Sequence, residues 1–117
     1  MRLETELLDD GILKIVLDGR LDVEGTPAID MKFTALTATK QAAILVDMTN
    51  VSFLASIGMR TLLSCAKAAS KRGGKMVLLN PQPMVREVLD RSGVASLIPV
   101  YDDLEAAEAA LRGAGPS

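Results

Sequence analysis

The chain has no histidine, no tryptophan, a single cysteine and only three aromatic residues among 117. The absence of histidine removes the commonest general base and the commonest metal ligand. One cysteine excludes an intrachain disulfide bond and a cysteine-rich zinc site. So few aromatic rings disfavour a stacking platform for single-stranded nucleic acid. The composition therefore predicts a protein with no metal and no cofactor.

Strong net charge and long hydrophobic runs are also missing. The formal net charge of −2 gives no electrostatic basis for binding nucleic acid or an anionic membrane. The first residues lack the run of about 7–15 apolar residues that a secretory signal needs. No segment reaches the roughly 18 apolar residues of a membrane-spanning helix. We therefore expect a cytoplasmic protein whose lone thiol, Cys65, stays reduced.

Length and an apolar content of 49% fit one domain, which we expect over residues 1–112, with a flexible tail over 113–117. Apolar runs and helical spacing alternate along it. They predict strands over 3–8, 12–17, 43–47, 76–79 and 97–100, and helices over 28–39, 56–70, 84–92 and 103–111. We expect Thr26 to cap the first helix, Asp102 and Glu105 to form a capping box for the last, and the stretch after Asp47 to be irregular. The alternation predicts a single α/β sheet packed by helices.

Motifs for catalysis and for phosphate binding are absent from the sequence. There is no G-x-G-x-x-G and no P-loop, and Gly73-Gly74-Lys75 follows a predicted helix instead of preceding one. Cys65 lies in mid-helix without a histidine partner, so we interpret it as a small core residue. The acidic pairs Asp9-Asp10 and Asp102-Asp103 lie at a turn and at a helix start, where acids are common. Without a nucleophile and its base, we do not expect an enzyme.

The predicted helix from Ser56 carries the most informative pattern in the chain. On a helical wheel a core face gathers Met59, Leu62, Leu63, Ala66 and Ala69, while Arg60, Ser64, Lys67 and Lys71 fall on the opposite face. Ile57 and Thr61 also fall almost opposite the core, which indicates either ordinary exposure or a docking surface. Gly58 destabilises a helix, and on the docking interpretation it would admit a partner's backbone. Five basic residues and no acid between Ser56 and Lys75 fit either an acidic partner or a solvated face.

Ser56 itself has two interpretations. A serine at a helix start is ordinarily an N-cap, and that role alone would explain it. As a phosphoacceptor, it would place the phosphate at the positive end of the helix, with Arg60 one turn later as a further contact. A partner packed over Ile57 would then meet an added charge of about −1.5 to −2. The same modification would be tolerated by the fold and would expel the partner.

Several short motifs occur in an order that resembles the STAS domain family, specifically the bacterial anti-sigma-factor antagonists. The matching segments, which cover roughly residues 3–111, are Gly19-Arg20-Leu21-Asp22, Asp47 at a strand end, Val51 to Met59, Gly73-Gly74, Val85 to Leu89 and Ser92-Gly93-Val94. The resemblance implies a single STAS-like α/β domain with a small mixed β-sheet and helices packed mainly on one face. Two positions depart from the family motif: Ala55 replaces its aspartate and Ile57 its second hydroxyl residue.

The resemblance also implies partner switching. The unmodified antagonist would bind a serine-kinase anti-sigma factor and free the sigma factor, the kinase would spend ATP to phosphorylate the antagonist, and a serine phosphatase would reverse the change. The phosphorylated serine of the motif corresponds to Ser56. We assign partner binding to the loop and helix positions around it: Asp22, Val23, Ile57, Gly58, Arg60, Thr61 and Ser64.

Two other functions remain open from the sequence. The domain could be a constitutive STAS adaptor, for example a subunit of a transporter or of another regulatory complex, in which Ser56 is only an N-cap. It could also bind a small ligand or nucleotide, or be a minor enzyme.

Overall fold

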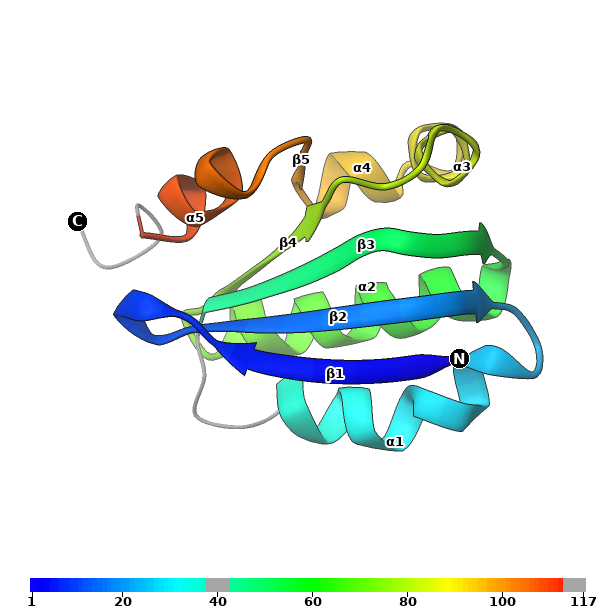
Figure 1. Cartoon of the computed structure of the whole chain (residues 1–117), viewed down its shortest axis with the longest axis horizontal. Coiled ribbons are helices and arrows are strands. Elements are labelled where there is room, and N and C mark those ends of the chain that lie inside the picture. The colour runs from blue at the N-terminus through cyan, green and yellow to red at the C-terminus, as the bar shows by residue number, and fades with distance from the viewer. Residues whose placement is uncertain (38–42, 113–117) are drawn as a thin grey trace.

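Five strands form one sheet in the order β1-β2-β3-β4-β5 (Figure 1). This computed structural model describes residues 1–37 and 43–112. β1 pairs antiparallel with β2, whereas β2, β3, β4 and β5 are parallel neighbours, so the sheet is mixed as predicted. The strands are β1 (Arg2–Leu7), β2 (Ile12–Leu21), β3 (Ala43–Leu54), β4 (Lys75–Leu79) and β5 (Val100–Tyr101).

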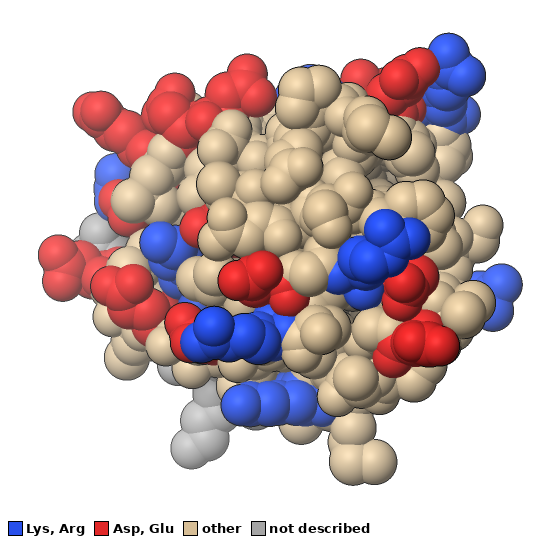
Figure 2. All heavy atoms as spheres, turned by 45° about the vertical axis from the view of Figure 1, so that its right-hand side comes forward, with Lys and Arg blue, Asp and Glu red and all other residues tan. Residues whose placement is uncertain are grey.

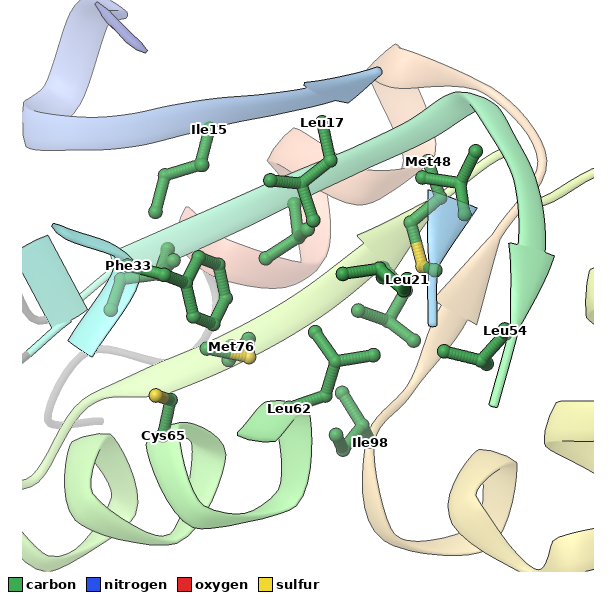
Figure 3. Packing of buried hydrophobic residues seen from close by; sticks show 14 of the residues in the cluster. Ile15, Leu17, Leu21, Phe33, Met48, Leu54, Leu62, Cys65, Met76 and Ile98 are labelled. Atoms are coloured by element: carbon green, nitrogen blue, oxygen red, sulfur yellow. The ribbon is translucent and has the colours of Figure 1, made fainter. Parts of the chain in front are cut away.

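The helices cover the two faces of the sheet unequally. They are η1 (Asp9–Gly11, one 3-10 turn), α1 (Gly25–Thr37), α2 (Ser56–Lys71), α3 (Pro83–Ser92), α4 (Val94–Leu97) and α5 (Leu104–Arg112). The larger buried cluster joins the sheet to residues of α1, α2, α3 and α4, and Figure 3 shows Leu62 and Cys65 of α2 beneath the strands with Phe33 of α1. A smaller cluster joins Leu45 and Val77 to Ala107 and Leu111 of α5. The expected packing of helices mainly on one face is confirmed.

The third strand is much longer than its apolar run predicts. β3 continues to Leu54, so the irregular stretch expected after Asp47 is wrong. Met48, Val51 and Leu54 are all buried in the main cluster, which explains why polar residues between them do not interrupt the strand. The extension pairs with the end of β2, which carries two register shifts on the way. It brings the start of α2 to the edge where β2 and β3 end.

The predicted strand over 97–100 is also wrong at its first residues. Gly93 adopts a positive φ of 85°, which ends α3 and allows the one-turn helix α4 to follow at once. The Ile98 amide then donates to the Val94 carbonyl, and only Val100 and Tyr101 pair with β4.

The caps differ from those predicted. Thr26 lies inside α1 and is 1% exposed, while the Asp22 carboxylate accepts the free amides at the helix start. At α5 the side chain of Asp103 accepts the Ala106 amide, and Asp102 pairs instead with an arginine of α3. The expected end of the first helix and the expected tail lie outside the described residues. Among the described helices, none has the length and apolar character needed to cross a membrane.

Candidate functional site

Ser56 is the first residue of α2, and its side chain is exposed. The residue in the N-cap position is Ala55, whose extended backbone leads out of β3 without any side-chain cap. The Ser56 hydroxyl makes no hydrogen bond to another described residue. The interpretation of this serine as an ordinary N-cap is therefore wrong, and the hydroxyl has no structural partner in the described part of the chain.

The start of α2 is fixed tightly against the end of β2. The Ala55 amide donates to the Leu21 carbonyl at 2.9 Å, and the Met59 amide donates to the Ala55 carbonyl at 3.1 Å. Gly58 is buried at this junction, and a Cβ added to it would lie 2.8 Å from Leu21 Cβ and 3.0 Å from the Leu21 oxygen. The glycine therefore serves close packing within the chain. The expectation that Gly58 admits a partner's backbone is corrected by this contact.

Asp22 organises the loop that follows β2. Its Oδ1 accepts the amides of Gly25 at 2.7 Å and Glu24 at 3.1 Å, and its Oδ2 accepts the Arg20 Nε–H at 3.0 Å. The amide hydrogen bond from Gly25, and then the Arg20 side chain, lower the pKa of the Asp22 carboxyl below its usual 3.8. Val23 lies at the tip of this loop with 74% of its surface exposed. The loop thus presents an apolar side chain from a rigid base.

A cation–π contact joins the two strand ends beside Ser56. The Arg20 guanidinium lies 4.4 Å from the centre of the Phe53 ring, while it also pairs with Asp22. Sequence reasoning quoted both residues within motifs but assigned no role to either. The contact follows from the strand register, in which Arg20 of β2 pairs with Phe53 of β3, and this register is not visible in the sequence. Figure 2, turned toward this end of the molecule, shows charged side chains around a broad uncharged area.

The buried face of α2 is turned by about 70° from the predicted one, on a count of 100° per residue. Its buried residues are Gly58, Leu62, Cys65 and Ala69. Ile57 is half-buried and not fully exposed, and the Thr61 hydroxyl donates to Asp30 of α1 at 3.1 Å. α1 thus packs against the side of α2 that was expected to be free.

The exposed face of α2 agrees with the helical wheel. Ser56, Arg60, Ser64 and Lys67 are all exposed along it. They line a hollow of about 350 Å³ whose other wall includes Ser92 and Val94. Neither Arg60 nor Lys67 forms an ion pair with another described residue. The structure therefore brings Ser56, Arg60 and Ser64 to one open face, with Asp22 and Val23 at the neighbouring strand end.

The STAS domain family model matches residues 7–107. The chain belongs to the STAS domain family. Among curated relatives, this STAS domain is 31% identical over 107 residues to BtrV of Bordetella bronchiseptica, with 92% of each chain covered. It is 29% identical over 94 residues to a Paenibacillus polymyxa protein named anti-sigma F factor antagonist, with 80% of each covered.

Solved structures agree on the fold. An anti-sigma factor antagonist from Mycobacterium paratuberculosis superposes with a TM-score of 0.82 at 25% identity, with 95% of each chain covered. SpoIIAA, an anti-sigma factor antagonist solved in its unphosphorylated form, gives a TM-score of 0.77 at 26% identity, with 96% of this chain and 97% of SpoIIAA covered. The resemblance inferred from the short motifs is confirmed at the level of family and fold.

Proposed function

We propose that this STAS domain is an anti-sigma-factor antagonist that acts by partner switching. It binds a serine-kinase anti-sigma factor while Ser56 is unmodified, and phosphorylation of Ser56 ends the complex. The observation that carries the proposal is the exposed Ser56 hydroxyl, which no described residue binds although it opens a rigidly held helix. The domain itself catalyses no reaction, and a serine phosphatase restores the binding form. Because the kinase uses ATP, phosphorylation and partner exchange take place in the cytoplasm under this proposal.

The surroundings of Ser56 favour a switch over a simple modification. A phosphate on the first residue of α2 would lie near the free amides of the first turn and near Arg60, which follows one turn later in the same hollow. The folded domain would therefore tolerate the charge. The apolar side chains that a partner could cover, Val23 and Phe53, flank the same strand ends. A partner packed there would bury the charge and would lose affinity.

The comparisons support the same proposal. A Paenibacillus polymyxa relative is named for antagonism of an anti-sigma F factor. SpoIIAA has been solved in an unphosphorylated and in a phosphorylated form. We infer that the present domain exchanges between two such forms at Ser56.

The decisive experiment incubates the full chain with its purified kinase anti-sigma factor and ATP, followed by intact mass spectrometry and peptide mapping. We expect one added phosphate, on Ser56, that is lost in Ser56→Ala and kept in Ser64→Ala, an exposed serine two turns later on the same face. The phosphorylated chain should bind the kinase at least about tenfold more weakly, which is about 1.4 kcal/mol. Phosphate on another residue would refute the assignment. Stable binding with no phosphorylation would instead indicate a constitutive adaptor.

A further inference from the structure

A row of adjoining hollows, called the groove below, follows α2 from Ser56 to its C-terminal end. Three adjoining hollows of about 350, 330 and 420 Å³ lie between α2 and the segment from the end of α3 to β5. The first two share Leu63 and Lys67, and the last two share Ala66, Ser70 and Leu97. Since α2 has 16 residues, the groove is about 24 Å long at a rise of about 1.5 Å per residue. That length accommodates about four turns of a second helix.

The middle of the groove is apolar. Leu63 and Ala66 of α2 form one wall, and Leu97 and Ile98 form the other. Leu97 lines both the second and the third hollow, and 70% of its surface is exposed because no described side chain covers it. One exposed leucine is ordinary, but a leucine beside an apolar hollow offers a contact for the apolar stripe of a partner helix.

The rim of the groove is basic and unneutralised. Arg60, Lys67 and Lys75 line it, and none of the three forms an ion pair with another described residue. Elsewhere on the surface, Arg86 and Arg91 each pair with carboxylates on or beside α3. The sequence from Ser56 to Lys75 holds no acidic residue that could neutralise the rim locally. The groove therefore combines apolar walls in its middle part with basic side chains along its rim that no described carboxylate neutralises.

We propose that this groove binds an acidic amphipathic α-helix of a partner protein. The apolar stripe of that helix lies on Leu63, Ala66 and Leu97, and its carboxylates face Arg60, Lys67 and Lys75. Charge complementarity selects an acidic occupant over a neutral or basic one and speeds the encounter. This binding site extends well beyond the Ser56 end of the domain and requires no modification of the chain.

The test uses the unphosphorylated full chain and a fluorescein-labelled, hydrocarbon-stapled helix of 18 residues with leucine on one face and glutamate on the other. Two control peptides carry the same composition in scrambled order, or lysine in place of every glutamate. We expect the acidic helix to bind in fluorescence anisotropy, with both controls at least about tenfold weaker. Equal binding of the scrambled or the basic peptide would overturn the proposal.

Variants then locate the binding site. Leu97→Asp and the double variant Arg60→Glu/Lys67→Glu should each weaken binding at least about tenfold. Matched controls are Met31→Asp and Lys32→Glu, which change exposed residues on α1 outside the groove and should leave affinity within about twofold. Circular dichroism verifies that each variant is folded. Loss in the α1 controls as great as in the groove variants would refute the proposal, as would a wild-type dimer that Leu97→Asp dissociates, because a second copy would then occupy the groove.

Discussion

Replacing Gly58 with alanine tests how the start of α2, which carries Ser56, is held against the end of β2. An added Cβ would meet Leu21 Cβ at 2.8 Å, the Leu21 oxygen at 3.0 Å and Leu54 Cδ1 at 3.0 Å. Carbon atoms pack best at about 3.5–4.0 Å, so all three contacts are too close. The Leu21 oxygen cannot retreat freely, because it accepts the Ala55 amide. The helix start must therefore move away from β2.

Two opposing effects set the magnitude. Overpacking in a filled interior costs about 1–3 kcal/mol. Alanine is favoured over glycine within a helix by about 0.8–1.0 kcal/mol, which offsets part of that cost. Because one of the clashes is with backbone, we expect Gly58→Ala to lower the free energy of unfolding by about 1–2 kcal/mol net. For a chain of 117 residues this corresponds to a fall in Tm of about 4–8 °C.

Urea denaturation followed by circular dichroism measures the change. The matched control compares Ser64→Gly with Ser64→Ala, at an exposed position of the same helix, where alanine should be the more stable by about 0.8–1.0 kcal/mol. If Gly58→Ala stabilises the domain by the same amount as this pair, α2 is not packed closely on β2. The assignment of Gly58 to internal packing would then be wrong.

Two further predictions concern ionisation and reactivity. The pKa of the Asp22 carboxyl is lower in the folded domain than its usual value of 3.8. The ionised carboxylate therefore stabilises the fold fully above pH 3.8, and this stabilisation is lost as the pH falls toward the lower pKa of the folded state. In urea denaturation, the difference in unfolding free energy between wild type and Asp22→Asn should narrow from about pH 5 to about pH 3. A deficit that does not change over this range would contradict the shift. Cys65 is buried within the main cluster, so its thiol should react with an aromatic disulfide reagent far more slowly in the native domain than in urea; equal rates would show that the helix opens freely.

Local sequence signals were sufficient where one effect dominates. The strands β1, β2 and β4 and the helix α3 were all predicted close to their observed positions, because their apolar patterns are encoded by single short segments. The ordered short motifs predicted the family for the same reason. These elements also fix the general place of Ser56 at the start of a helix.

The errors arose where tertiary packing decides between local alternatives. β3 extends through Thr49 and Asn50 because Met48, Val51 and Leu54 find a core that no short window shows. The helical wheel of α2 was misplaced because its core face left out the small residues Gly58 and Cys65, which are both buried. The separate interpretation of Cys65 as a core residue is confirmed. The predicted helix caps were wrong for a related reason. Asp22 and Asp103 accept the amides at the helix starts in place of the predicted Thr26 and Asp102, and only the path of the chain selects between such neighbouring residues.

The serine at the head of α2 shows how such an error bears on function. From sequence, an N-cap role accounts for Ser56 and weakens any functional argument. In the structure Ala55 takes the cap position, and the loop at Asp22 and the packing of Gly58 fix the helix start without help from the hydroxyl. The start of α2 is therefore held in place by residues other than Ser56. A polar group that the fold does not use, held at a fixed point between exposed Val23 and the cations of α2, is suited to receive charge without unfolding the domain that carries it.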